Sequence, residues 1–286
     1  MAANGFGPLR TRYGTTRDLI VGVTLVRADG VVARGGGKVV KNVAGFDLPR
    51  LMVGSLGTLG LIATATFRLH PLPEVVETVV FTDLAAAGVR RLAAQIRESQ
   101  LEPAAVGAVG IGPFDVGLRF EGFGAAVIAQ RDKLLDIGRR SGGGCGLLDE
   151  KDGRAFWARH DAIRTAGTLR AKFAAPPSEL ETVAQEVIAP LASAIGEAGG
   201  VTYPTLGLGF VSGAPASAAP IAAIGAARAA LARLGGSLVI HASPAALRAD
   251  LDVWGAPPPA IGLMRSLKAQ MDPSQRLGPG RFVDGI

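Results

Sequence analysis

The chain has 286 residues, 48% of them hydrophobic and 19% charged, and this balance excludes an intrinsically disordered protein. Aromatic residues make up only 5%, which argues against single-strand nucleic-acid binding by base stacking, and the single cysteine, Cys145, excludes an internal disulfide. The formal net charge of +6 resides entirely in residues 1–70, where nine basic side chains face three acidic ones, and indicates either an anionic partner or a solubilising basic face.

The part of the chain before Pro71 is predicted to be rich in β-strand, with one short helix. An Asp29-Gly30 pair, of the kind that joins hairpin strands, separates the first two strands. Asp47 and Pro49 are typical of the start of a helix. The predicted strands span 19–27, 31–34 and 61–69, and the predicted helix spans 47–53.

A run of spaced glycines stands between that helix and the third strand. Gly54, Gly57 and Gly60 follow one another at intervals of three, with Ser55 and Thr58 between them. Each glycine costs about 0.5–1 kcal/mol of order relative to alanine in a helix or strand, so the run indicates a backbone that must lie against a ligand or a packed strand. The spacing is not the G-x-G-x-x-G of a dinucleotide fingerprint, because it is G-x-x-G-x-x-G and a strand follows it.

The pattern changes at Pro71-Leu72-Pro73, which is predicted to be a stiff connector. Residues 74–241 predict two rough copies of strand–helix–strand–strand–helix, an order that favours an antiparallel sheet with helices packed on one face. Within them we expect a loop over 142–146, further strand structure over 201–211, and a helix opened by a capping box at Ser178 and Glu181. A helix over 261–271 and a tail rich in Pro and Gly follow.

Neither a metal site nor a membrane segment is predicted. The histidines His70, His160 and His241 are far apart in sequence, and Cys145 is interpreted as an incidental thiol. The sequence contains neither a secretory signal nor a long uncharged apolar stretch, which predicts a cytoplasmic protein with no transmembrane segment.

Two stretches of the chain resemble the vanillyl-alcohol-oxidase/PCMH-type FAD-linked oxidases. The specific part of the first, within residues 12–73, is K-N-V-A-G-F-D-L followed by G-S-x-G-T-L-G. The second, over residues 267–281, has the form L-K-x-x-x-D-P-x-x-x-L-x-P-G-R. Within that superfamily the chain is most similar to the FAD-binding subunits of glycolate oxidase. It departs from the family at Gly278, where asparagine is usual.

The resemblance implies an α+β fold, with the second half of a PCMH-type FAD-binding domain joined to a cap domain. Residues 1–73 would form the C-terminal half of the FAD-binding domain. Residues 74–250 would form the cap, an antiparallel sheet of ferredoxin-like βαββα units with helices on one face. Residues 251–286 would form a C-terminal helix and tail that return to the FAD domain. The family's FAD domain begins with a further half that carries a glycine-rich loop, so we expect a truncated protein that binds FAD weakly or not at all.

The resemblance also implies which residues lie along FAD, mainly through backbone groups. These are Tyr13, Gly14, Thr15, Arg17, Asp18, Gly54, Ser55, Gly57, Thr58, Leu59, Gly60 and Ile62. Arg12 and Arg17 would face either phosphate or structure. Lys41, Asn42 and Asp47 would hold the glycine turn in place. The sequence identifies no catalytic base.

The function implied is that of a subunit of an FAD-dependent oxidoreductase of the glycolate oxidase type. Its substrate would be a 2-hydroxy acid such as glycolate or D-lactate. Its partners would be a larger flavin subunit and an iron–sulfur subunit, with peripheral membrane association through those partners and no nucleic acid. The alternative is a non-catalytic assembly or binding subunit that docks to a flavoprotein/iron–sulfur complex.

Overall fold

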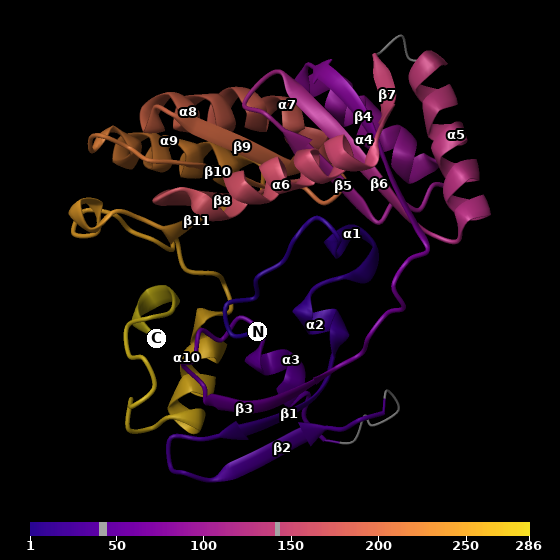
Figure 1. The fold of residues 1–286 in the computed structure, drawn as a ribbon. Coiled ribbons are helices and arrows are strands. Elements are labelled where there is room, and N and C mark those ends of the chain that lie inside the picture. Colours follow the sequence, from indigo (N-terminus) through magenta and orange to yellow (C-terminus); the bar gives the residue numbers. More distant parts are fainter. Residues whose placement is uncertain (40–44, 141–143) are drawn as a thin grey trace. The chain divides into compact units, whose positions relative to one another are not determined.

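The computed structural model of the protein describes residues 1–39, 45–140 and 144–286. The chain divides into two compact units (Figure 1). Unit 1 comprises Met1–Pro71 and Ala256–Ile286, and unit 2 comprises Leu72–Gly255. Unit 1 is therefore built from two stretches of chain that are far apart in sequence.

Unit 1 contains a three-stranded antiparallel sheet in the order β2-β1-β3. The strands are β1 (Ile20–Val26), β2 (Val32–Gly36) and β3 (Leu61–Phe67). The helices are α1 (Arg10–Tyr13), α2 (Thr16–Leu19), α3 (Leu48–Met52) and α10 (Ile261–Met271), with a 3₁₀ turn at Val283–Gly285. The predicted hairpin is confirmed: Gly30 has a φ of +83°, and the Val31 amide donates to Asp29 Oδ1 at 3.1 Å.

The core of unit 1 is small. It consists of five buried apolar side chains, from β1, from α3 and from the residues that lead into β3. They are Ile20, Val23, Leu25, Met52 and Leu59. Leu267 and Met271 of α10 pack against this cluster, so the C-terminal helix completes a core that the N-terminal residues begin.

Unit 2 contains an eight-stranded antiparallel sheet in the order β11-β8-β10-β9-β5-β6-β4-β7. The strands are β4 (Val75–Leu84), β5 (Ala105–Val109), β6 (Phe114–Gly122), β7 (Cys145–Leu148), β8 (Leu169–Ala174), β9 (Ala198–Tyr203), β10 (Leu208–Gly213) and β11 (Ser237–Ala242). The helices are α4 (Ala86–Glu98), α5 (Gly124–Arg140), α6 (Glu150–Ala166), α7 (Leu180–Val183), α8 (Ala189–Ile195) and α9 (Ala219–Arg233). A 3₁₀ turn over Pro177–Glu179 precedes α7, a π-helical turn over Ala184–Ile188 joins α7 to α8, and another 3₁₀ turn covers Ala245–Leu247.

The elements of unit 2 occur in the same order twice, as β4-α4-β5-β6-α5 and as β8-α7/α8-β9-β10-α9. Each copy contributes three neighbouring strands to the sheet, and the copies meet where β5 pairs with β9. That junction pairs Ala108 with Thr202 and Val109 with Val201. The eight strands therefore form one continuous sheet.

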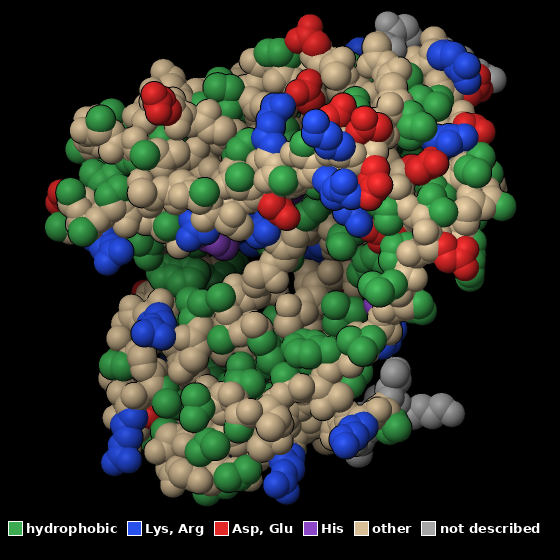
Figure 2. All heavy atoms as spheres, viewed as in Figure 1, with side chains coloured by type: hydrophobic (Ala, Val, Ile, Leu, Met, Phe, Trp, Pro, Cys, Tyr) green, Lys and Arg blue, Asp and Glu red, His purple; other side chains and the backbone are tan. Residues whose placement is uncertain are grey.

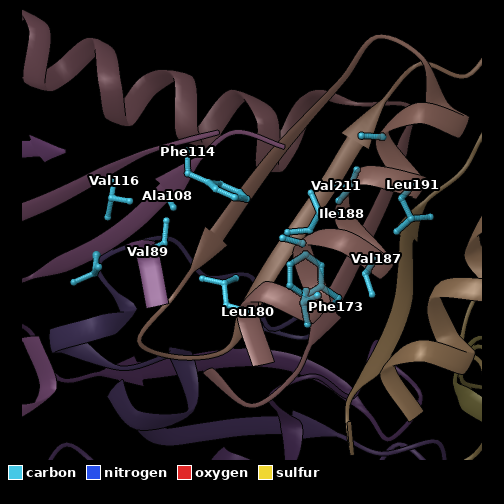
Figure 3. Packing of buried hydrophobic residues seen from close by; sticks show 14 of the residues in the cluster. Val89, Ala108, Phe114, Val116, Phe173, Leu180, Val187, Ile188, Leu191 and Val211 are labelled. Atoms are coloured by element: carbon cyan, nitrogen blue, oxygen red, sulfur yellow. The ribbon is translucent and has the colours of Figure 1, made fainter. Parts of the chain in front are cut away.

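One face of this sheet carries the main hydrophobic core, which Figure 3 shows from close by. Val89 of α4 and Leu191 of α8 belong to it, together with Ala108 and Val116 of the central strands. The helix α6 is the exception to the predicted one-sided layering. It packs on the opposite face, where a Cβ on Gly107 would lie 3.1 Å from the Trp157 and His160 side chains. Glycine between larger residues leaves room for this helix.

Two local predictions for unit 2 are wrong, the loop over 142–146 and the capping box at Ser178. The predicted loop gives way at Cys145 to strand β7, which pairs with β4. The strand structure predicted over 201–211 consists of the hairpin β9–β10, turned at Gly207 with a φ of +64°. Ser178 forms no capping box, since its hydroxyl contacts Glu179 Oε1 at 3.3 Å inside a 3₁₀ turn.

The charged side chains are distributed differently over the two units. Figure 2 shows acidic and basic groups interspersed on the face of unit 2 that bears α6, where Arg154 pairs with Glu150 and Arg159 with Asp115. In the same view the exposed charges of unit 1 are mostly basic. Across the part of the chain that the structure describes, no helix has the length and apolar character needed to cross a bilayer.

Candidate functional site

The glycine turn, residues 54–60, connects α3 to β3 in unit 1. Gly54 and Gly57 have φ values of +82° and +80°, and Leu56 between them has a φ of +51°. These are left-handed conformations that favour glycine, so two of the three spaced glycines are explained by backbone geometry alone. Among the described residues, and apart from its two chain neighbours, no atom lies within 4 Å of the position that a Cβ on Gly57 would occupy, so the turn is open there.

The polar side chains of the turn are used internally. Ser55 Oγ donates to the Met52 carbonyl at 2.9 Å, and Thr58 Oγ1 donates to the Ser55 carbonyl at 2.8 Å. Both residues are buried, with exposed fractions of 6% and 2%. Their hydroxyls therefore fix the shape of the turn, and a ligand would meet the backbone.

The side chains of the last predicted residues, at the end of the turn and the start of β3, pack inward and leave only backbone groups for a ligand. Leu59 belongs to the core of unit 1 and Ile62 packs against it. A Cβ on Gly60 would lie 3.3 Å from the Val26 carbonyl, so this glycine permits close packing of the turn against β1.

Three amide groups of the turn have no partner among the described residues: the N–H groups of Gly57, Leu59 and Gly60. The neighbouring amides are satisfied, with Gly54 donating to the Met1 carbonyl and Leu56 to the Ala2 carbonyl. Unpaired backbone N–H groups are the kind of donor that binds phosphate, ribose or ring oxygens.

Asn4 is a candidate that sequence reasoning missed. Its Oδ1 is buried and has no hydrogen-bond partner within the described part of the chain. Its Cβ lies 3.6 Å from the position of a Cβ on Gly54, so it borders the glycine turn. A buried acceptor without a donor is costly, and a ligand hydroxyl or amino group would satisfy it. Asn4 lies in a Gly-rich segment with no periodicity, and therefore gave no signal.

The second predicted segment, Tyr13 to Asp18, opens helix α2. The Asp18 carboxylate accepts from the Thr15 amide at 2.7 Å and from Thr15 Oγ1 at 2.8 Å, which forms a capping box. These two hydrogen bonds lower the pKa of Asp18. A Cβ on Gly14 would lie 2.7 Å from the Asp18 Cβ, and Gly14 has a φ of +77°. Asp18, Thr15 and Gly14 therefore build the start of the helix.

The remaining side chains of this segment face outward or contact an aromatic neighbour. The Tyr13 ring lies 4.8 Å from the ring of His70, centroid to centroid. The guanidinium of Arg12 lies 5.9 Å from the Tyr13 ring centroid. Arg17 is exposed, and its guanidinium has no partner within residues 1–39, 45–140 and 144–286. Of the two arginines, Arg17 is the one available to a phosphate.

The structure places the two predicted segments on neighbouring elements, because α2 contacts α3 and α3 runs into the glycine turn. Asp47 caps α3 by accepting from the Arg50 amide at 3.1 Å. Lys41 and Asn42 lie outside the described residues.

The C-terminal part of unit 1 reaches the glycine turn, which local sequence patterns did not reveal. Lys268 Nζ on α10 donates to the Thr58 carbonyl at 2.9 Å and to Asp272 Oδ2 at 2.6 Å. Arg281 Nη1 donates to the Leu56 carbonyl at 3.4 Å. Burial raises the pKa of Asp272, but the Lys268 hydrogen bond and two backbone amides together outweigh this effect and lower the pKa to about 2.

Two other residues considered in the sequence analysis, His160 and Cys145, lie in packed surroundings in unit 2. His160 is fully buried in unit 2 between Trp157 and Tyr203, with ring centroids 5.6 and 5.2 Å away. Cys145 lies on β7, and its Sγ approaches Gly138 of α5. Across the described residues no group of three or more His, Cys, Asp or Glu side chains is arranged to hold a metal ion.

Comparison with solved structures defines the fold. Over 98% of this chain and 67% of the other, the structure superposes on p-cresol methylhydroxylase with a TM-score of 0.66 at 12% identity. A VAO-type flavoprotein from Myceliophthora thermophila gives a TM-score of 0.61 at 16% identity, over 96% of this chain and 58% of that one. The fold is thus that of the VAO/PCMH-type flavoproteins.

Sequence comparison narrows this class. Glycolate oxidase subunit GlcD of Bacillus subtilis is 47% identical over 77 residues, which are 27% of this chain and 16% of GlcD. Subunit GlcE of Escherichia coli is 35% identical over 130 residues, 45% of this chain and 35% of GlcE. D-lactate dehydrogenase of Archaeoglobus fulgidus is 44% identical over 71 residues, 25% of this chain and 16% of that protein. No protein-family model matches.

Over the matched stretches the chain is therefore similar to subunits of glycolate oxidase and to D-lactate dehydrogenase. The matched stretches span only 16–35% of the lengths of these three relatives.

Proposed function

We propose that unit 1 is part of the FAD-binding domain of an FAD-dependent oxidoreductase of the glycolate oxidase type. The observation that carries this proposal is the open glycine turn, whose Gly57 and Leu59 N–H groups have no partner in the described structure. The kinship with glycolate oxidase subunits supports FAD as the ligand. FAD supplies a two-electron acceptor for oxidation of a hydroxyl-bearing carbon.

In this proposal the chain's own groups hold and orient the cofactor. The Gly57 and Leu59 amides donate to its oxygens, and Asn4 Oδ1 accepts from one of its hydroxyl or amino groups. Arg17 pairs with a phosphate. The proposed site keeps the predicted residues, with backbone contacts along the turn and with Ser55, Thr58, Thr15 and Asp18 fixing local shape.

The wider assignment is also a proposal. The substrate is a 2-hydroxy acid such as glycolate or D-lactate, in line with the names of the matched relatives. Residues 72–255 act as the cap domain of the complete enzyme. The partners are a larger flavin subunit and an iron–sulfur subunit, and the complex is cytoplasmic, with any membrane contact made through those partners.

A pair of glycines tests the proposal. Gly57 and Gly30 both have left-handed φ values, +80° and +83°, and both have nothing within 4 Å of a Cβ. Alanine at either position costs about 1–2 kcal/mol of stability through the same backbone strain. Only Gly57→Ala places a methyl group where FAD would approach.

FAD is titrated to millimolar concentration against the wild-type chain and both variants, with flavin fluorescence as the readout. We expect saturable binding to the wild type, a similar dissociation constant for Gly30→Ala, and a dissociation constant at least about tenfold higher for Gly57→Ala. Equal affinities of the two variants, or no saturable binding by the wild type, would show that the turn does not bind FAD.

A further inference from the structure

The glycine turn holds a conformation that its own sequence does not favour. Leu56 has a φ of +51°, a left-handed value that costs a residue with a side chain roughly 1–2 kcal/mol. Strain of this kind persists only where the surroundings impose it. Two carbonyls of the turn, those of Leu56 and Thr58, accept hydrogen bonds from residues more than 200 positions later in the chain, Arg281 and Lys268.

Lys268 is anchored more firmly than a surface lysine. Its side chain is only 9% exposed, and its three N–H bonds have three acceptors: the Thr58 carbonyl, Asp272 Oδ2 and the Leu277 carbonyl. Asp272 is fully buried and also accepts from the amides of Arg276 and Leu277. The ammonium group thus ties the end of α10, the tail and the turn to one point.

We propose that Lys268 and Arg281 are positioning residues that hold the glycine turn in its ligand-binding conformation. The Leu56 carbonyl and the Gly57 N–H belong to one peptide group and point in opposite directions, and the same holds for the Thr58 carbonyl and the Leu59 N–H. Because Arg281 and Lys268 bind the two carbonyls, these two N–H groups are turned away from them and stay unpaired. The binding competence of the N-terminal turn therefore depends on the C-terminal segment. The inference rests on the proposed function only in naming FAD as the ligand.

A purely stabilising role predicts something different. If the Lys268–Asp272 pair served only the core of unit 1, its loss would lower the stability of the whole unit evenly. A positioning role predicts a local effect on the turn, and the same effect from Arg281, which is exposed and lies outside the core. The two roles are separated by a measurement resolved along the chain.

The test uses hydrogen–deuterium exchange of the ligand-free chain, read at peptides that cover residues 54–60. The variants are Arg281→Gln and the double variant Lys268→Met with Asp272→Asn, which removes both charges together. The control is Arg265→Gln. Arg265 also joins α10 to the tail, through Asp284, but among the described residues it forms no hydrogen bond with the glycine turn.

We expect exchange at the Leu56 and Thr58 amides to accelerate at least about tenfold in Arg281→Gln and in the double variant, and to stay at the wild-type rate in Arg265→Gln. Unchanged exchange in Arg281→Gln would overturn the proposal, even if the double variant failed to fold. In a parallel titration, the FAD dissociation constant should rise at least about tenfold in Arg281→Gln. If the wild type bound no FAD, the proposed function would fail, but the exchange data would still test whether Lys268 and Arg281 position the turn.

Discussion

His160 shows how one buried side chain sets a pH dependence. Its ring is fully buried between Trp157 of α6 and Tyr203 of β9, and neither ring nitrogen has a hydrogen-bond partner in the described structure. Burial lowers the pKa of His160 to about 4, although the Asp161 carboxylate, 3.5 Å from Nδ1, acts in the opposite direction. The Arg164 charge lowers it further. The folded protein therefore keeps this imidazole neutral.

The consequence for stability has a definite sign. The pKa of an unfolded histidine is 6.5, so between pH 6.5 and pH 4 the unfolded chain binds a proton that folded His160 does not. Stability is complete above pH 6.5, falls by up to roughly 3 kcal/mol as the pH drops to 4, and then levels off. Urea unfolding midpoints measured at several pH values should show this slope.

His160→Phe should remove about half of the stability lost between pH 6.5 and 4, because burial also lowers the pKa of His241 to about 4. The double variant His160→Phe with His241→Phe should remove most of the remaining slope. An undiminished slope in His160→Phe would assign the acid sensitivity to other groups. Asp272 acts in a separate window, because its lowered pKa makes its contribution disappear between about pH 4 and pH 2.

At this scale the sequence indicates some site residues and hides others. Gly54 and Gly57 were predictable, because glycine adopts the left-handed backbone found there with the least strain. Lys268 belongs to the motif over residues 267–281 that resembles the family, but its hydrogen-bond partner, the Thr58 carbonyl, is 210 residues away in the sequence. No local pattern reports a contact of that range. Asn4 is a candidate solely because its buried oxygen lacks a partner.

Among the elements, α5 and β7 approach each other with no space to spare. A Cβ on Gly138 of α5 would lie within 3.0 Å of the Phe81 ring and still closer to the Cys145 Sγ. Strand β7 is short and at the edge of the sheet, so this contact is its main anchor beyond pairing with β4. Close approach therefore overrides the usual preference of helices for alanine over glycine.

Gly138→Ala should destabilise the protein by about 1–3 kcal/mol through overpacking. Gly225→Ala in α9 should have the opposite sign, a gain of up to about 1 kcal/mol, because no atom lies within 4 Å of its Cβ position. Denaturant unfolding measures both changes.

Combining Gly138→Ala with Cys145→Ala should recover most of the loss, since the thiol is the nearest obstacle. Additive effects of the two changes would mean that α5 and β7 do not press on each other at this point.

The errors in element prediction have separate physical causes. The strand β7 was missed because it follows a glycine-rich run, a composition typical of loops. The turn between β9 and β10 was not located, because both strands are apolar and the turn ends at a glycine without an Asn-Gly or Asp-Gly signal. The helix signal at Ser178 was correct about a helix and wrong about the cap, because the prolines before it start a 3₁₀ turn.

For the whole molecule, the two units differ in the size of their cores. Among the described residues, the cluster of unit 1 has five buried apolar residues, whereas that of unit 2 has 33. Buried apolar area is the dominant source of stability, so we expect unit 1 to be the less stable of the two. Separate cores also allow separate unfolding.

Unfolding should therefore occur in two transitions. Both tryptophans, Trp157 and Trp254, lie in unit 2, so their fluorescence reports that unit alone. Far-UV circular dichroism should show an additional transition at lower urea, which tryptophan fluorescence does not follow. Coincident curves from the two probes would instead indicate one cooperative molecule.

The division of unit 1 between both parts of the chain has a consequence for biosynthesis. A chain emerges from the ribosome in order, so the glycine turn is made long before Lys268 and Arg281 exist. Unit 2, which is continuous, is complete in between. On a growing chain the turn therefore stays without Lys268 and Arg281 until all of unit 2 has been synthesised.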